Sequence, residues 1–177
     1  MKQGKTNIVE LAKAIQHEAD NKKDYVSPSQ LMSIEANGSL RVAMQDADGG
    51  KMDMPLTQHA SRQLGAKFGI PAKYFDRMLA DAPDLLASNA NHWLHQEPKD
   101  LMVRTLFGKV RGIMSNRYQR IDNVNIAEDI LPFLLEQQTN GLEIASCEVT
   151  EKKLYIKAVM HKMVSEIKKG DVVEAGL

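Results

Sequence analysis

The residues best suited to chemistry lie in a basic stretch, Leu101–Arg120. It carries five positive side chains and no acidic one, and Phe107 and Tyr118 are interleaved among them. Guanidinium groups bind phosphates as forks, and aromatic rings stack on unpaired bases, which is the usual chemistry of single-strand binding. The stretch predicts contact with single-stranded DNA through Arg104, Lys109, Arg111, Arg117, Tyr118 and Arg120. A hairpin with a solvated basic face and Tyr118 in the core explains the same pattern.

Two further sets of residues have the right types for nucleic-acid contact. Lys152, Lys153 and Lys157 would extend the positive surface, although Lys152-Lys153 also fits an ordinary solvated turn. Trp93, between two histidines, would serve as a stacking platform, but a single Trp at helical spacing favours a core position.

Other kinds of site find little support in the sequence. His92 and His95 have the i, i+3 spacing of a helical metal pair with Glu97 nearby, yet the remaining histidines are scattered. Adjacent carboxylates such as Glu128 and Asp129 point about 100° apart on a helix, so they do not act as a catalytic pair. There is no Gly-rich phosphate loop, nucleophile elbow or redox cysteine pair. We therefore expect no enzyme, no cofactor and no metal.

Composition limits the protein class. Lys plus Arg and Asp plus Glu both total 23, so the net charge does not indicate a nucleic-acid partner, although a local basic face is compatible with a zero total. A single cysteine, Cys147, excludes an internal disulfide and suits a reducing compartment. The N-terminus lacks the apolar core of a secretory signal, and no apolar run approaches the length of a membrane span. A cytoplasmic location follows as the expectation.

Local patterns in the N-terminal half predict a helix, a hairpin and a set of short helices. Apolar spacing predicts a helix over Ile8–Ile15 with Thr6 or Asn7 as its cap, and the polar stretch His17–Asp24 is expected to end it. The Asn37-Gly38 pair predicts a tight hairpin turn. Strands are expected at Leu31–Ile34, Leu40–Met44 and Lys51–Met54, and helices after Thr57, after Pro71 and over Leu85–Leu94.

The C-terminal half reads β-β-α-β-β. A hairpin is expected around Gly108-Lys109, a helix over Val124–Gln138 kinked by Pro132, and a last hairpin after Asn140-Gly141. The helix is expected to lie across the C-terminal sheet. The predicted shared core consists of Ile130, Phe133, Leu134, Ile144, Leu154 and Ile156.

These elements predict an α+β fold in which antiparallel β-hairpins pack against several helices. We expect one domain over 1–177, with an N-terminal helix and hairpin in 1–56, a helical segment in 57–98 and a β-β-α-β-β core in 101–160. Met1–Lys5 and the residues after Lys168 lack a packing pattern of their own, so mobility is expected there. The abrupt ending suggests the N-terminal part of a longer protein.

Many short motifs in one order resemble the phage and plasmid family catalogued as domain of unknown function 932. They cover most of the chain from residue 56 onward: Leu56-Thr57 with Ala60 and Gln63-Leu64, Gly69-Ile70-Pro71 with Tyr74, Leu85-Leu86 with Asn91 and Trp93-Leu94, Val103-Arg104-Thr105, Val110-Arg111-Gly112, Ser115 with Arg117-Tyr118, Ile121-Asp122-Asn123, Leu131-Pro132 and Gly170-Asp171-Val172. Members of that family usually continue past the position of Leu177.

From Tyr118 onward, a weaker resemblance is to phage single-strand annealing proteins of the Erf type. The shared order is a tyrosine, a helix ending near Leu131–Leu134 and a hairpin containing Leu154–Ala158. That resemblance implies a sheet and a long helix that form a basic groove for DNA. The sequence thus favours an oligomeric phage- or plasmid-type protein in DNA recombination or replication. The alternative is a non-enzymatic counter-defence or interaction factor that binds a host protein.

Overall fold

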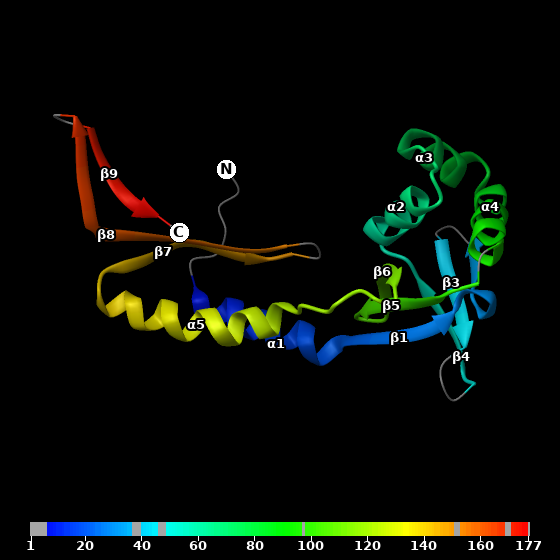
Figure 1. Cartoon of the computed structure of the whole chain (residues 1–177), viewed down its shortest axis with the longest axis horizontal. Helices are drawn as coiled ribbons and strands as arrows, with labels where there is room; N and C mark the ends of the chain where they lie inside the picture. Colours follow the sequence, from blue (N-terminus) through cyan, green and yellow to red (C-terminus); the bar gives the residue numbers. More distant parts are fainter. Residues whose placement is uncertain are drawn as a thin grey trace. The chain divides into compact units, whose positions relative to one another are not determined.

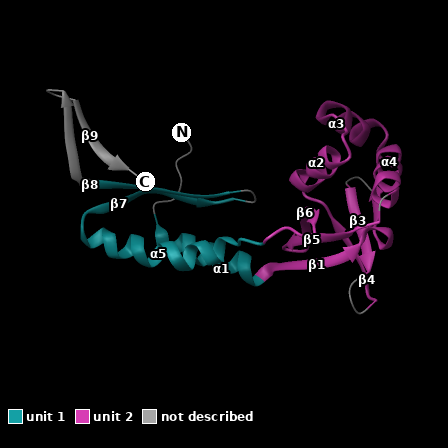
Figure 2. Ribbon diagram, in the orientation of Figure 1, with its two compact units in different colours: residues 1–20, 120–177 teal, residues 21–119 magenta. Residues whose placement is uncertain are grey.

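The computed structural model describes residues 7–36, 40–45, 49–96, 98–150, 153–168 and 171–176, with side chains described only as far as residue 160. The fold is α+β with antiparallel sheets, as the sequence predicts. The chain divides into two compact units: unit 1 comprises residues 1–20 and 120–177, and unit 2 comprises residues 21–119 (Figure 2). These boundaries differ from the segments 1–56, 57–98 and 101–160 for two reasons. The first helix joins the C-terminal unit, and the hairpin predicted around Gly108-Lys109 belongs to unit 2, so 101–160 is not one β-β-α-β-β core.

Among the residues that the structure describes, unit 2 contains two antiparallel sheets of three strands each. The first has the order β1-β5-β6 and the second the order β2-β3-β4 (Figure 1). In the second sheet Ile34 lies opposite Val42, as the predicted hairpin requires, while its turn residues 37–39 lie outside the described residues. The strands are β1 (Lys22–Pro28), β2 (Ser33–Ala36), β3 (Leu40–Gln45), β4 (Lys51–Pro55), β5 (Asp100–Leu106) and β6 (Lys109–Ser115), with the short 3-10 turn η1 (Ser29–Leu31) after β1.

The described part of unit 2 also contains the helices α2 (Gln58–Lys67), α3 (Ala72–Asp81) and α4 (Pro83–Gln96). Thr57 caps α2 as predicted, since its hydroxyl accepts from the Ala60 N–H at 3.2 Å. Helix α4 is joined to β2 by Asn91, whose amide group bonds both the N–H and the C=O of Ile34 at 2.7 and 2.8 Å. Apolar residues from both sheets and all three helices form one core, which includes Val42, Leu64, Leu86 and Val103.

Strand β1 was missed by the sequence analysis. Helix α1 (Ile8–Asn21) continues through the polar stretch expected to end it, and β1 follows at once. Its cap is Asn7, whose side chain accepts from the Val9 N–H at 2.9 Å. Because β1 is an edge strand with few buried residues, it lacks the alternating apolar pattern that marks a strand in a sequence. The β5–β6 turn is also displaced by one residue, to Phe107-Gly108, where both φ angles are positive.

Unit 1 is built from α1, α5 (Asn123–Thr139) and a sheet of order β7-β8-β9, with α5 lying along β7 and β8 (Figure 1). Its strands are β7 (Leu142–Val149), β8 (Leu154–Lys168) and β9 (Asp171–Gly176). Asn140 caps the end of α5 and Gly141 has φ 95°, so the predicted helix exit into a strand is confirmed. A second core forms here from Ile8, Leu11, Ile15, Ala127, Leu134, Leu142, Ile144, Cys147 and Ala158.

The predicted core of unit 1 was partly wrong. Leu134 and Ile144 are buried, and Leu154 and Ile156 pack against the core, but Phe133 is 51% exposed and Ile130 is 40% exposed. Helix α5 carries two apolar stripes, one through Ile130 and Phe133 and one through Ala127 and Leu134. Side chains of adjacent helical residues point about 100° apart around the helix axis, so the two stripes lie next to each other. The apolar spacing alone fits either stripe as the buried one. The structure buries the second stripe.

The C-terminal hairpin extends further than predicted. Strand β8 continues to Lys168 rather than ending at Met160, and β9 pairs with it although the sequence after Lys168 has no packing pattern of its own. Met1–Lys5 lie outside the described residues. Among the helices that the structure describes, none is both long enough and apolar enough to cross a membrane.

Candidate nucleic-acid interface

Three lysines and one aromatic ring gather at one end of the β1-β5-β6 sheet, which we call the turn end: Lys22, Lys23, Phe107 and Lys109. Lys22 lies opposite Leu106, and Leu106 lies opposite Lys109, so the two lysines flank one leucine in a cross-strand row. Strand spacing places their Cβ atoms about 10 Å apart. Lys23 lies opposite Thr105 and is exposed. The turn end is therefore basic on both faces of the sheet.

Phe107 is exposed at the turn end and has an unfavourable backbone conformation. Its φ is 49°, in the left-handed region that bulky residues rarely occupy, and the residue is 50% exposed. The backbone is held there because the Phe107 N–H donates to the Asn21 C=O at 3.2 Å. Asn or Gly would adopt this turn more readily. An exposed ring in a strained position adds nothing to the core, so it favours a role in binding.

A second pair of a cation and an aromatic ring lies just beyond the opposite end of β6. Arg117 and Tyr118 are both exposed, with Tyr118 at 48%. They are held by a turn in which the Arg117 N–H donates to Ser115 Oγ at 3.2 Å and the Tyr118 N–H donates to the Ser115 C=O at 3.0 Å. The seven residues of β6 place this pair about 20 Å from Phe107 and Lys109 at the turn end.

Arg111 lies between these pairs at a β-bulge. Thr105 pairs with Val110 and Arg104 with Gly112, which makes Arg111 the extra residue of β6. It is half-buried. The neighbouring backbone of β6 is partly used, because the Val110 C=O accepts from the Thr57 N–H at 2.8 Å. At Val110 the edge of β6 is therefore covered by the backbone of Leu56 and Thr57.

Arg104 must be removed from the predicted interface. Only 6% of the residue is exposed, and its Nε lies 3.1 Å from Oδ1 of Asp24. Asp24 is its direct cross-strand partner on β1. The sequence placed Arg104 on a solvated hairpin face because β1 was not recognised. In the structure β5 is the central strand, and its arginine forms a buried ion pair.

The remaining predicted residues belong to unit 1. Arg120 and Lys157 are exposed, and Lys153 is exposed with its Nζ 5.7 Å from the centre of the Tyr155 ring. Thr150 and Lys153 form the ends of a tight turn, with the Thr150 N–H donating to the Lys153 C=O at 2.9 Å. Lys152 lies outside the described residues.

The sequence analysis did not assign Lys22 and Lys23 to the interface. The only signal was two consecutive lysines in a stretch interpreted as polar loop. Their proximity to Lys109 results from β1–β5 pairing between residues far apart in the chain.

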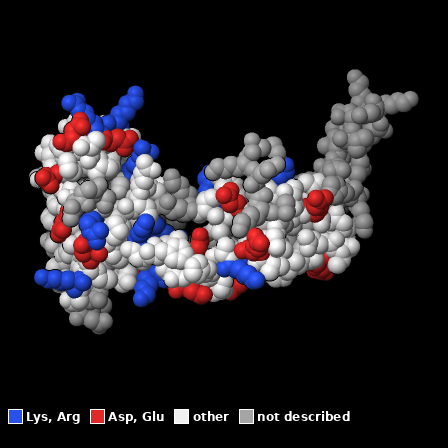
Figure 3. Space-filling model, turned by 180° about the vertical axis from the view of Figure 1, so that it is seen from behind, with Lys and Arg blue, Asp and Glu red and all other residues white. Residues whose placement is uncertain are grey.

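The charge distribution is mixed rather than uniformly basic. On the face of the molecule shown in Figure 3, Lys and Arg side chains alternate with Asp and Glu over the described residues. Several cations are paired on the surface, including Arg41 with Asp53 at 2.8 Å and Arg62 with Asp76 at 3.1 Å. On this face a nucleic acid would therefore meet local groups of cations and not one broad positive patch.

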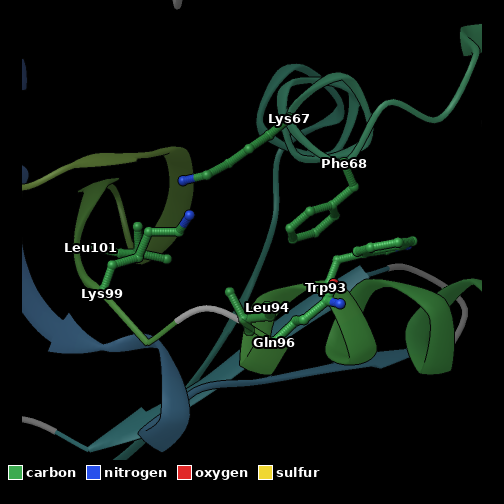
Figure 4. Close-up of a pocket in the computed structure, with 7 residues that line it drawn as sticks. All are labelled: Lys67, Phe68, Trp93, Leu94, Gln96, Lys99 and Leu101. Atoms are coloured by element: carbon green, nitrogen blue, oxygen red, sulfur yellow. The ribbon is translucent and has the colours of Figure 1, made fainter.

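A pocket of about 230 Å³ lies elsewhere in unit 2, where the ends of α2 and α4 meet the start of β5 (Figure 4). Its lining residues are Lys67, Phe68, Trp93, Leu94, Gln96, Lys99 and Leu101. Loss of hydration, followed by repulsion from Lys99, lowers the pKa of Lys67. Trp93 is 45% exposed, so the core position favoured from the sequence was wrong.

The described residues contain no group of three or more His, Cys, Asp and Glu side chains arranged to hold a metal ion. His95 bonds the backbone, since its Nε2 lies 2.7 Å from the Met32 carbonyl oxygen, and His92 contacts the Trp93 ring edge to face.

Comparison with known proteins adds no assignment: no family model, no curated protein and no solved structure matches this chain.

Proposed function

We propose that the chain is a single-strand nucleic-acid-binding protein, of the phage or plasmid kind whose motifs its sequence resembles. The observation that carries the proposal is the exposed ring of Phe107, held at positive φ among Lys22, Lys23 and Lys109. The pair Arg117 and Tyr118 repeats the same chemistry beyond the other end of β6. Unpaired bases stack on the rings, while the cations neutralise phosphates.

The proposed contact distinguishes single strands from duplexes. A base inside a duplex is stacked on its neighbours and its face is covered, whereas a single strand presents free faces to Phe107 and Tyr118. The cations contact any nucleic acid through its phosphates. We therefore expect binding to both forms at low salt, with the preference for single strands coming from the two rings.

The test is a titration of the purified chain with labelled single-stranded and duplex oligonucleotides over a series of salt concentrations. About four phosphate contacts imply a slope of about −2.8 in log K against log salt, from about −0.7 per contact. Lys109→Met and Arg117→Met should each make the slope shallower by about 0.7. Lys73→Met is the matched control, because Lys73 is an exposed lysine on α3, outside this sheet.

The stacking part needs a different pair of variants. Phe107→Asn keeps a residue that tolerates positive φ and removes the ring, so the turn is preserved. It should weaken single-strand binding by about 1–3 kcal/mol without changing the salt slope, as should Tyr118→Ala. Tyr74→Ala removes a ring that is 51% exposed on α3 and serves as the control. Equal affinity in all these variants, or no binding by the folded chain at low salt, would refute the proposal.

A second candidate, a protein-interaction factor, is favoured by one observation. Helix α5 exposes Ile130 and Phe133, four and seven residues after the half-buried Ile126, so an apolar stripe of unit 1 faces solvent. Such a stripe suits a protein partner, including the second copy that an oligomer would supply. Sedimentation of the chain and of Phe133→Ser tests self-association. If the chain stays monomeric and binds no oligonucleotide, a host protein becomes the better account of this surface.

A further inference from the structure

We propose that the pocket between α2, α4 and β5 binds a phosphorylated nucleoside, with the phosphate at Lys67 and Lys99 and the ring against Trp93. The ligand is either a free mononucleotide or one nucleotide of a strand, and the two share this chemistry. The free form is independent of the function proposed above. The strand form rests on it.

The phosphate end of the pocket is formed by two lysines from different elements. Lys67 ends α2, and its side chain extends toward Lys99, whose own side chain points to the same space (Figure 4). The backbone of Lys99 is fixed, because its N–H donates to Ser29 Oγ at 3.2 Å and its C=O accepts from the Ser29 N–H at 2.9 Å. Both ammonium groups thus face one space, in which a single phosphate would lie within reach of the two side chains.

The direction of the pKa shift agrees with this geometry. Lost hydration, and secondly the charge of Lys99, lowers the pKa of Lys67. Lysine at the end of a helix is often stabilised by the last carbonyls of that helix. Here the Lys67 side chain reaches across the pocket instead (Figure 4).

The ring end of the pocket is aromatic and open. Phe68 and Trp93 both line it, and Trp93 leaves 45% of its surface exposed. Trp93 is oriented by an edge-to-face contact with His92, with ring centres 5.1 Å apart. Gln96 adds an amide that both donates and accepts hydrogen bonds, as the edge of a base requires. An inorganic anion would use the lysines alone, whereas this lining also fits a planar ring.

The size of the pocket limits the ligand. A volume of about 230 Å³ is below the roughly 300–1,000 Å³ of sites for drug-sized ligands, so it suits one nucleotide that remains partly in solvent. Leu101, which lines the pocket, lies opposite Ser115, two residues before Arg117. The pocket is thus at the same end of the sheet as the Arg117 and Tyr118 pair. A strand bound there has a short path to it.

The chain provides its own reporter, because Trp93 is the single tryptophan. We would follow its fluorescence during titration with thymidine monophosphate, thymidine and inorganic phosphate. Thymidine monophosphate should quench Trp93 saturably, and thymidine and phosphate should bind at least about tenfold more weakly, since each lacks a charged or a stacking contact. The proposal would be overturned if phosphate or thymidine bound as tightly as thymidine monophosphate. It would also be overturned if thymidine monophosphate did not quench the fluorescence of the folded chain.

Variants locate the phosphate. Lys67→Met and Lys99→Met should each weaken thymidine monophosphate by about tenfold, as expected for one lost hydrogen bond to a charged group, while Lys73→Met should not. Unchanged affinity in both pocket variants would place the ligand elsewhere. A single-stranded oligonucleotide that competes with thymidine monophosphate identifies a strand nucleotide as the occupant, and one that does not identifies the free form. The two proposals fail separately, since the Lys109 and Arg117 variants should leave thymidine monophosphate binding intact.

Discussion

Removing Asp24 should destabilise unit 2 more than most single substitutions. The Asp24 and Arg104 side chains are 8% and 7% exposed, and Arg104 Nε lies 3.1 Å from the carboxylate. Asp24→Ala removes the carboxylate paired with a buried guanidinium, which typically costs about 3–5 kcal/mol. A denaturant slope of about 2 kcal/mol per M of urea converts this cost into a midpoint shift of about 2 M.

The double variant Asp24→Val with Arg104→Met separates the ion pair from its burial. Replacing both partners with apolar residues removes the uncompensated charge, so we expect most of the lost stability to return. The coupling energy from the cycle of the parent chain, Asp24→Val, Arg104→Met and the double variant measures the interaction between the two side chains. Independent, additive effects would show that the pair is not an energetic unit.

The chain contains a separate probe for each unit. Trp93 lies in unit 2 and reports its unfolding by fluorescence, while the buried thiol of Cys147 lies in unit 1 and reports its opening by reaction with a thiol reagent. Because the two cores are separate, Asp24→Ala should lower the urea midpoint reported by Trp93 fluorescence and leave Cys147 protected.

One result would refute the reasoning about Arg104. If Arg104→Met folds with normal stability but loses salt-dependent oligonucleotide binding, Arg104 belongs to the interface.

Two further predictions concern unit 1. Leu134→Ala should cost about 2–5 kcal/mol and Phe133→Ala less than about 0.5 kcal/mol, because only Leu134 is buried; urea unfolding followed by circular dichroism compares them. Burial, and secondly Glu10, raises the pKa of Cys147 above its ordinary value. Between the unfolded value of about 8.5 and the raised folded value, the unfolded thiol ionises while the folded one stays protonated, so stability should fall as pH rises. Urea midpoints across this range should fall less steeply in Cys147→Ala, and an unchanged slope would contradict the shift.

Elements governed by local chemistry were predictable. The caps at Asn7 and Thr57, the helix exit at Asn140-Gly141 and the order of hairpins and helices all depend on neighbouring residues. Turn and cap preferences act over a few residues, so a single sequence contains the relevant information. The α+β class follows from that order.

Edge strands and helix faces were not predictable in the same way. Strand β1 has no alternation to reveal it, and it forms because β5 offers hydrogen bonds to a segment some eighty residues away in the chain. Helix α5 carries two apolar stripes of comparable strength, and the packing of unit 1 selects the one through Ala127 and Leu134. Local periodicity indicates that a helix is amphipathic but not which neighbour it meets.

The sequence by itself determined the class of fold, the main turns and the chemistry available to the chain, namely lysines and arginines interspersed with a few aromatic rings. The tertiary structure decided which of those residues act together. Pairing of β1 with β5 buries Arg104 against Asp24 and brings Lys22 and Lys23 to Lys109. The packing of α2 and α4 around β5 directs Lys67, Lys99 and Trp93 into one pocket. Burial and charge are properties of neighbours in space, and these neighbours are far apart in the chain.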